Sequence, residues 1–293
     1  MIATYGRGAQ LCSLLKQLTG QSLQPDEIII VDQTPQYPPE IAERLKSFQQ
    51  RNIHYIRQSD ISVSKARNLG ALKSTADILI FIDDDVVLGN NFVQNHLKNY
   101  IDETIDGVGG QVLNNDDPQP MPIIAKELFA FPYGYMHFPT SSSISAVTQT
   151  LVGTNFSIRR NLYLAIGGFD ENLCYAEDMD FSFRLQGHRL IFAPEASLFH
   201  LRLSQGGMSY LDVHSYLKPT LYYQSLFYCY LRNYFIDQPL GTIWLILKLF
   251  RVWILNKHNL RRPLLLMRQI FHFVMGFVSA CCLLLKKRKL ISK

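Results

Sequence analysis

The sequence predicts an α/β fold, a mostly parallel sheet flanked by helices, followed by a separate helical region. Apolar runs of strand length alternate with helical patterns through the first 200 residues, which is typical of βαβ units. Residues 28–31 and 78–82 are wholly apolar, as in strands that are buried on both faces. Beyond about residue 210 these runs give way to long helical patterns with many basic residues. We therefore expect two regions, residues 1–207 and residues 208–293.

The elements of the first region follow from the changes in apolar periodicity. We expect strands at residues 1–5, 27–32, 53–56, 78–82, 152–158 and 191–193. Helical patterns separate them at residues 11–18, 41–48, 64–74 and 177–185. Residues 114–120 contain Asn, Asp and Pro and predict a loop, and residues 123–145 have only weak periodicity. Because ligands of parallel α/β sheets bind at the carboxyl ends of the strands, the residues after each strand are candidates for a site.

Composition limits the class of protein. An apolar fraction of 47% and an aromatic fraction of 12% exclude a disordered chain. The five cysteines are an odd number, and none of them forms a C-x-x-C pair. This pattern argues against a disulfide framework or a zinc site and favours a reducing compartment.

The charge of the chain is divided unevenly between its two ends. The formal net charge is +5, but Asp237 is the last acidic residue and 11 Lys and Arg follow it. Residues 1–237 hold 18 basic and 24 acidic side chains, a balance of −6. A tail that is both basic and strongly apolar suits an anionic membrane surface better than nucleic acid. We therefore expect a membrane partner and no nucleic-acid partner.

Two apolar stretches of the tail suit contact with a membrane. Residues 243–255 carry Lys248 and Arg251 among apolar side chains, and residues 270–285 carry no Lys, Arg, Asp or Glu. A stretch of 16 residues falls short of the roughly 20 that a spanning helix needs. We expect amphipathic or shallowly inserted helices. A single span, or a helical bundle packed on the first region, are the alternatives.

The strongest functional signal is the acidic run Asp83-Asp84-Asp85 directly after the strand at residues 78–82. Three neighbouring carboxylates repel one another unless something neutralises them. A divalent cation with oxygen ligands, shared with a phosphate, is a common solution. Tyr5 and Asp32 stand at the ends of other expected strands, so a parallel sheet brings them to the same edge. The alternative is that the acids cap a helix or lie solvated in a loop.

Six short motifs occur in order along the chain: Thr4–Arg7, Ile30–Asp32, Ala66–Gly70, Phe81–Asp85, Gly167–Glu171 and Ala176–Asp180. Over about residues 1–200 this series resembles the motif set of family 2 glycosyltransferases. The resemblance implies the GT-A fold, a mostly parallel, Rossmann-like sheet flanked by helices, with a C-terminal helical membrane-associated region. The aromatic residues around 230–234 and the basic tail are similar to the membrane-associated ends of bacterial polysaccharide and rhamnosyl-type transferases.

The same resemblance implies a nucleotide-sugar donor and a divalent cation, Mg²⁺ or Mn²⁺. The residues implied in donor binding are Thr4, Tyr5, Arg7, Asp32, Arg67, Asp83 and Asp84. Among them, Asp32 would accept a hydrogen bond from the base, and Arg67 would face the phosphates as a permanent cation. The implied metal ligands are Asp85, Asp83 and His200. For Asp32, Arg67 and His200 the alternatives are a turn residue, a surface arginine and a structural histidine.

The resemblance also implies roles for the acids of the helix at residues 177–185. Asp178 would take the proton of the acceptor hydroxyl, with Glu177 beside it, and a single displacement would invert the anomeric configuration. The alternative is that these acids cap the helix N-terminus, and the two roles are compatible. The Gln-x-x-Arg-Trp motif of processive polymer synthases is absent from the sequence, so we expect transfer of one sugar per event.

The expected function is therefore metal-dependent transfer of a sugar from a nucleotide-sugar to a saccharide or lipid-linked acceptor. The expected setting is cell-surface polysaccharide or glycolipid synthesis, on the cytoplasmic face of the membrane, with peripheral or shallowly inserted attachment. A metal-dependent nucleotidyltransferase or phosphohydrolase could use the same acids. A non-catalytic membrane-binding module is the third alternative.

Overall fold

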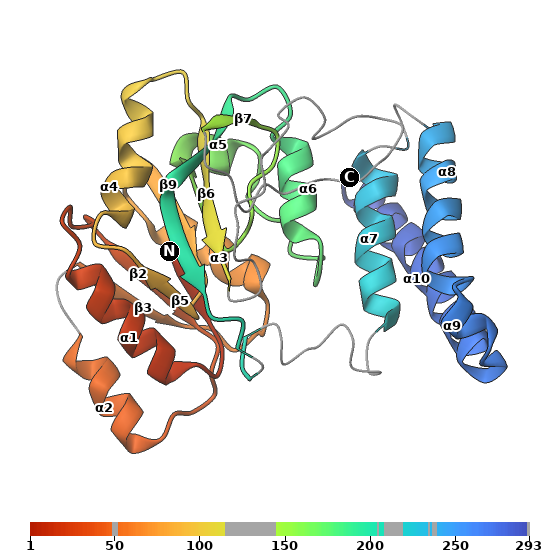
Figure 1. The fold of residues 1–293 in the computed structure, drawn as a ribbon, viewed down its shortest axis with the longest axis horizontal. Helices are drawn as coiled ribbons and strands as arrows, with labels where there is room; N and C mark the ends of the chain where they lie inside the picture. The colour runs from red at the N-terminus through yellow and green to blue at the C-terminus, as the bar shows by residue number, and fades with distance from the viewer. Residues whose placement is uncertain are drawn as a thin grey trace.

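The computed structural model describes residues 1–48, 52–114, 145–203, 205–207, 219–233, 235 and 239–291. These residues form an α/β body and, beside it, a group of C-terminal helices (Figure 1). The expected loop at residues 114–120, except for its first residue, and the weakly patterned segment up to residue 144 lie outside the described residues. The expected boundary at residues 207 and 208 borders another such segment and stays a prediction.

One sheet organises the α/β body. Its strands in chain order are β1 Ile2–Thr4, β2 Ile28–Asp32, β3 Ile53–Arg57, β4 Ile78–Ile82, β5 Val86–Leu88, β6 Gly107–Leu113, β7 Ala146–Thr148, β8 Asn155–Arg159 and β9 Leu190–His200. Their spatial order is β3-β2-β1-β4-β8-β6-β9-β5, and β7 pairs with β9. Strands β1 to β4 pair in parallel, with Thr4 opposite Asp32, so their carboxyl ends lie at one edge.

The second half of the sheet is mixed. Strand β8 runs antiparallel between β4 and β6, and β9 pairs in parallel with β6 but antiparallel with β5 and β7. The α/β fold is confirmed, and its parallel pairing lies among the first four strands and between β6 and β9, whereas the other pairs are antiparallel. Strand β6 was not predicted from the sequence because it contains three glycines, which weaken a strand pattern. One of them, Gly110, lies so close to its neighbours that a Cβ would be 2.2 Å from the Ala196 carbonyl oxygen.

Helices cover the sheet and enclose its core. They are α1 Gly8–Thr19, α2 Pro39–Ser47, α3 Val63–Lys73, α4 Phe92–Leu97, the short 3₁₀ helix η1 Lys98–Ile101, α5 Arg160–Ala165 and α6 Glu177–Arg184. The apolar face of α1 packs through Leu11, Leu14 and Leu15 in a core with residues of β1, β2 and β4. A second core is aromatic, with Phe81 of β4 stacked on Phe156 of β8 at 4.6 Å between ring centroids. This aromatic core supports the end of β4 from which the acidic run begins.

The C-terminal helices form one packed group. They are α7 Pro219–Asn233, α8 Pro239–Leu249, the π-helix η3 Phe250–Ile254, α9 Lys257–Leu260 and α10 Pro263–Ile291. Helix α7 lies between α6 and α10, with Phe227 buried among residues of both (Figure 1). Helices α7 and α10 cross closely at Gly276 of α10. A Cβ at this position would lie only 2.4 Å from the Cβ of Tyr223 on α7.

The length of α10 corrects one expectation. The helix has 29 residues, and its segment Pro263–Lys286 is long and apolar enough to cross a membrane by length and composition. The apolar stretch at residues 270–285 is thus part of a longer helix, and the conclusion that it is too short was wrong. Sequence periodicity missed the first two turns because Arg268 interrupts the apolar run.

Candidate active site

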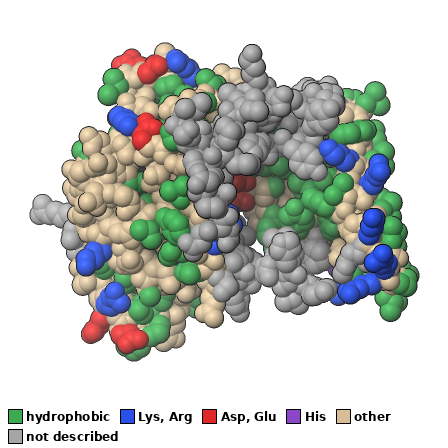
Figure 2. All heavy atoms as spheres, in the orientation of Figure 1, with side chains coloured by type: hydrophobic (Ala, Val, Ile, Leu, Met, Phe, Trp, Pro, Cys, Tyr) green, Lys and Arg blue, Asp and Glu red, His purple; other side chains and the backbone are tan. Residues whose placement is uncertain are grey.

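A cavity of about 430 Å³ opens where β1 and β4 end. Its lining includes every site residue that the sequence analysis named, except Asp32. Strand β1 and the following turn contribute Thr4, Tyr5 and Arg7, and helix α3 contributes Arg67. The acidic run, the start of α6 and the end of β9 complete the wall. In Figure 2, acidic side chains are visible deep in the hollow between the α/β body and the helical group.

The three consecutive aspartates point in different directions. Asp84 is buried and faces β1, where its Oδ2 accepts a hydrogen bond of 2.6 Å from Thr4 Oγ1 and its Oδ1 accepts one of 2.9 Å from Arg7. Burial raises the pKa of Asp84 to about 6, although Thr4 and Arg7 favour its ionised form. Asp84 therefore lines the cavity with both carboxylate oxygens already bonded to the chain, and its role in donor binding stays a prediction.

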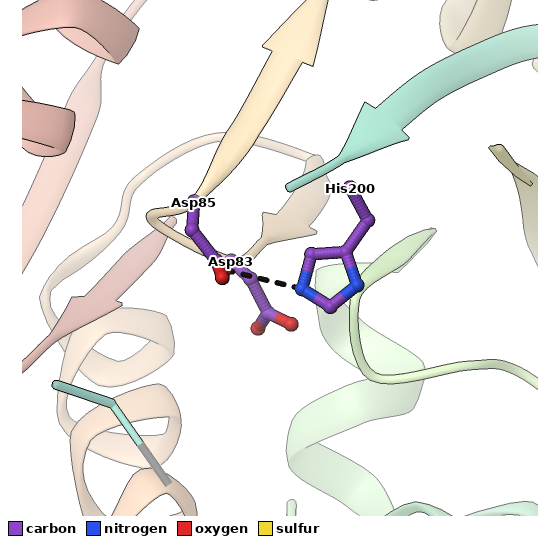
Figure 3. A group of neighbouring side chains, drawn as sticks. All are labelled: Asp83, Asp85 and His200. Carbon is purple, nitrogen blue, oxygen red and sulfur yellow. Dashed lines mark hydrogen bonds and ion pairs between the residues drawn. The ribbon is translucent and has the colours of Figure 1, made fainter. Parts of the chain in front are cut away.

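Asp83 and Asp85 converge instead with His200, as Figure 3 shows. One ligand atom from each of the three lies within 4.8 Å of the others. His200 is the last residue of β9 rather than a residue after it, and it stands opposite Val86 of β5. Because β9 pairs with both β5 and β6, the sheet itself brings the histidine to the acids. The two carboxylates suit Mg²⁺ or Mn²⁺, so this donor set fits the expected cation.

The charges around Asp85 already favour its ionised state. Burial alone would raise the pKa of this carboxyl, but His200 Nε2 at 3.2 Å from Oδ1, Arg7 and the Leu203 amide outweigh it. The resulting pKa lies below the ordinary value. In the same pair, burial disfavours the imidazolium while Asp85 favours it, and the pKa of His200 is raised.

Arg67 connects the acidic run to helix α6. Its NH2 group contacts Asp83 Oδ1 at 3.2 Å and donates to the Gly153 carbonyl at 2.9 Å, and its NH1 group contacts Glu177 Oε1 at 3.2 Å. The guanidinium lies over the ring of Phe169, 5.1 Å from its centroid. A Cβ at residue 153 would lie 2.9 Å from the guanidinium, so a larger residue there would require Arg67 to shift. Arg67 is thus buried in the wall of the cavity, unlike a surface helix arginine.

Asp178 lies in the first turn of α6, immediately after Glu177. The preceding Ala176 has the left-handed φ of 56°, and its side chain provides no cap. Burial raises the pKa of Asp178 to about 7; the charge of Glu177 adds to this shift and Arg67 opposes it. Its Oδ1 accepts a hydrogen bond of 2.8 Å from the Met179 amide, so it also contributes to the helix N-terminus. A carboxyl with a pKa near neutrality is suited to accept a proton.

Asp32 is the one named residue that does not line the cavity. It is fully buried, and its Oδ1 accepts hydrogen bonds from the Thr34 amide at 2.8 Å and Tyr37 Oη at 3.2 Å. Its Oδ2 accepts from Arg57 at 3.0 Å and from Tyr55 Oη. These partners leave the carboxylate facing the chain, and the adjacent Gln33 lines the cavity.

Residues after β9 line the site without having been expected from the sequence. Arg7 donates to the Leu203 carbonyl at 3.0 Å and to the Gln205 carbonyl at 2.9 Å, and the Gly207 amide donates to the Tyr5 carbonyl at 2.8 Å. The segment therefore closes one side of the cavity around Arg7. Its short, irregular sequence carries no periodicity that could have revealed this contact.

Comparison with known proteins gives relatives of one kind. A family model, glycosyl transferase family 2, matches residues 1–167. The O-antigen chain rhamnosyltransferase RfbN of Salmonella typhimurium is 24% identical over 206 residues, which cover 68% of this chain and 65% of that protein. WbaN of Salmonella anatum, also an O-antigen chain rhamnosyltransferase, is 26% identical over 209 residues, 68% of this chain and 64% of its own. The matched region thus spans slightly less than two thirds of these relatives.

Solved structures share the fold. Residues 1–349 of S. aureus TarS in complex with UDP-GlcNAc superpose with a TM-score of 0.66 at 17% identity, over 95% of this chain and 80% of that one. GalNAc-T7 with UDP, GalNAc and Mn²⁺ gives a TM-score of 0.57 at 16% identity, over 85% and 53% of the two chains. At such identities the likeness shows the fold alone, and the expected GT-A fold is confirmed. Because the family model covers more than half of its residues, this chain belongs to glycosyl transferase family 2.

Proposed function

We propose that this chain is an inverting glycosyltransferase that moves a sugar from a nucleotide-sugar to a saccharide or lipid-linked acceptor. One observation carries the proposal: a single cavity holds both the Asp83–Asp85–His200 cluster and Asp178, a carboxyl with a raised pKa. The first group suits a cation and a diphosphate, and the second suits a proton acceptor. Relatives named O-antigen chain rhamnosyltransferases support a role in cell-surface polysaccharide or glycolipid synthesis.

The donor would bind on the side of the cavity formed by β1 and β4. That side is lined by Thr4, Tyr5 and Arg7, and by Gln33 where the sequence had pointed to Asp32.

The cation, Mg²⁺ or Mn²⁺, would be held by Asp83, Asp85 and His200, and when bound it neutralises charge on the diphosphate. Arg67 would supply a permanent positive charge next to the same phosphates. The structural neighbour GalNAc-T7 was solved with UDP and Mn²⁺, which supports a nucleoside diphosphate and a divalent cation as the molecules bound here.

The acceptor would approach from the side of α6. Asp178 takes the proton of the acceptor hydroxyl as that oxygen attacks the anomeric carbon. The bond from that carbon to the diphosphate oxygen breaks, and the nucleoside diphosphate leaves with the bonding electrons. One displacement at one carbon inverts its configuration. The ion pair between Arg67 and Glu177, at 3.2 Å, fixes the start of α6 relative to the donor side, which aligns the base with the reacting carbon.

The helical group would attach this enzyme to an anionic membrane on the cytoplasmic face. Three side chains of α10 are strongly exposed, Leu264 at 83%, Met267 at 68% and Phe271 at 59%. In Figure 2, basic side chains lie beside hydrophobic ones along the outer edge of the group. The opposite face of α10 packs on α7, with Phe273 and Phe227 rings 4.8 Å apart. A spanning α10 would lose this packing, so we propose peripheral or shallowly inserted attachment.

A donor screen tests the proposed reaction. The purified full-length chain is incubated with UDP-, GDP- and dTDP-sugars, Mn²⁺ and a bacterial lipid extract, and released nucleoside diphosphate is measured. Release from one donor, and its loss in Asp178→Asn, is the expected result. Titration calorimetry with UDP, GDP and dTDP, with and without Mn²⁺, accompanies the screen. Release of phosphate or pyrophosphate instead would favour a phosphohydrolase or nucleotidyltransferase, and no nucleotide binding would favour a non-catalytic module.

A further inference from the structure

Helix α7 of the C-terminal group bonds directly to the helix that carries Asp178. The NH1 group of Arg232 lies 2.6 Å from Asp170 Oδ2 and 3.2 Å from Asp180 Oδ1. Asp180 is two residues beyond Asp178 on α6, and Asp170 belongs to the segment that leads into this helix. Helices α6 and α7 face each other across this contact (Figure 1).

Further hydrogen bonds complete the network. Tyr228 Oη donates to Asp170 Oδ2 at 2.9 Å, and Asn233 Nδ2 donates to Asp180 Oδ1 at 3.0 Å. The second oxygen of Asp180 accepts a hydrogen bond of 2.9 Å from Arg184 Nε, within α6. Asp180 is fully buried and Asp170 is 7% exposed, so the two carboxylates depend on these partners. Charged pairs of this kind are directional, and they fix one relative position of α6 and α7 where apolar packing alone would tolerate several.

Helix α6 needs such support. It has only eight residues, which is too few for stability in isolation. It begins directly after Ala176, whose left-handed backbone persists only where the surroundings hold it. Arg67 holds the first turn from the side of the α/β body through Glu177, and Arg232 holds the helix from the side of α7 through Asp180. Asp178 lies between these two attachments.

We propose that Arg232 is a positioning residue for sugar transfer, and this inference rests on the proposed role of Asp178 as the base. By pairing with Asp170 and Asp180, Arg232 holds α6 in the position in which Asp178 faces the cavity. The C-terminal helical group is then part of the catalytic unit in addition to being its attachment to the membrane. A displacement of α7 would move the base.

The first test measures the position of α6 and needs no substrate. Hydrogen–deuterium exchange is followed in the full-length chain and in Arg232→Gln. This substitution keeps a polar side chain but removes the positive charge. We expect amides of residues 177–185 to exchange at least tenfold faster in this variant, with those of α1 unchanged. The matched control is Arg251→Gln, at an exposed arginine of η3 in the same helical group. Its amides should exchange at the rates of the unsubstituted protein. Unchanged exchange in α6 of Arg232→Gln would overturn the proposal.

The second test separates positioning from general support of the fold. With the donor found by the screen, Arg232→Gln should lower kcat at least tenfold, while the donor KM and Mn²⁺-dependent affinity for the nucleoside diphosphate stay unchanged. Arg232→Lys, which restores the charge, should recover part of kcat. A fall in nucleotide affinity equal to the fall in kcat would mean that the whole site collapses, and would overturn the positioning role.

A milder variant covers the case in which Arg232→Gln does not fold. Asn233→Ala removes the hydrogen bond to Asp180 but leaves its two arginine partners, Arg184 and Arg232, in place. It should change amide exchange and kcat in the same directions by a smaller factor. No change in either quantity would count against the network. If the original chain releases no nucleoside diphosphate from any donor while α6 still loosens in Arg232→Gln, the proposed function fails and the α6–α7 contact stands.

Discussion

Arg67 and Glu177 are 110 residues apart in the sequence and form an ion pair of 3.2 Å between α3 and α6. The same guanidinium contacts Asp83, so one side chain joins the acidic run to the helix of the proposed base. Removal of its charge therefore affects both halves of the cavity at once.

We expect Arg67→Gln to destabilise the protein by roughly 3 kcal/mol, because two carboxylates lose their buried partner. This value is at the low end for a broken buried ion pair, since Asp83 retains some contact with water. Urea unfolding measures the change, and calorimetry should show weaker nucleoside diphosphate binding. Arg44→Gln, at an exposed arginine of α2, is the control and should alter neither. Normal nucleotide affinity in Arg67→Gln would remove Arg67 from the donor site.

Replacement of the base should separate chemistry from binding. Asp178→Asn keeps the shape of the side chain but cannot take a proton, so transfer should fall by at least about 100-fold. Affinity for the nucleoside diphosphate with Mn²⁺ should stay within about twofold, because Asp178 lies on the acceptor side. Steady-state kinetics and calorimetry give the two numbers. A variant that retains near-normal turnover would show that another group is the base.

The activity should depend on pH through Asp178. Burial and the neighbouring Glu177 raise the pKa of Asp178 to about 7, while Arg67 opposes the shift. On α7, burial raises the pKa of the Cys229 thiol, and the charges of Asp180 and Asp178 add to this shift, so the thiol stays neutral. Since only the ionised carboxylate accepts a proton, kcat should rise with pH through about 7. A pH profile of kcat whose acidic limb lies near the ordinary aspartate pKa, about 4, would contradict this assignment.

Two adjacent acids should respond differently to substitution. Asp85→Ala removes a proposed ligand, and it should abolish the gain in nucleoside diphosphate affinity that Mn²⁺ produces. Asp84→Asn loses pairing with Arg7 in the wall of the cavity and should instead cost about 1–3 kcal/mol of folding stability, with the effect of Mn²⁺ retained. Calorimetry and thermal unfolding of both variants decide the matter. Equal loss of the Mn²⁺ effect in both variants would mean that Asp84 and Asp85 contribute alike to cation binding.

Membrane attachment should depend on the exposed apolar face of α10. The double variant Leu264→Ser/Phe271→Ser should bind vesicles containing anionic lipid at least about tenfold more weakly, because two large side chains lose apolar contact. Ile101→Ser, at a residue of the α/β body that is at least as exposed as either, is the control and should bind normally. Co-sedimentation at two salt concentrations measures both apolar and charge contributions. Undiminished sedimentation of the double variant would place the attachment elsewhere.

The sequence predicted the parts of the fold that are encoded locally. Apolar runs at residues 28–31 and 78–82 identified β2 and β4, and the acids that follow β4 line the cavity because strand ends share one edge of the sheet. Strand β6 was missed because its three glycines weaken the strand pattern, and one of them, Gly110, packs closely against Asn155 and the Ala196 backbone, which only the assembled sheet reveals.

Pairing between distant side chains could not be predicted. Asp32 ends a strand as expected, but Tyr55 and Arg57 of the adjacent strand occupy its carboxylate, and only the register of β2 on β3 sets that choice. The pairing of Arg232 with Asp170 likewise joins residues 62 positions apart on separate elements. Each residue type is compatible with a surface position, so neither pattern nor spacing reveals the contact.

The acidic run carries its counter-charges within the chain. Arg7 pairs with Asp84 and Asp85, and Arg67 pairs with Asp83, so repulsion among the three acids is relieved by arginines of the same domain. A cation held by Asp85 would compete with Arg7 for this carboxylate, so the affinity of the site for the cation would depend on that one guanidinium.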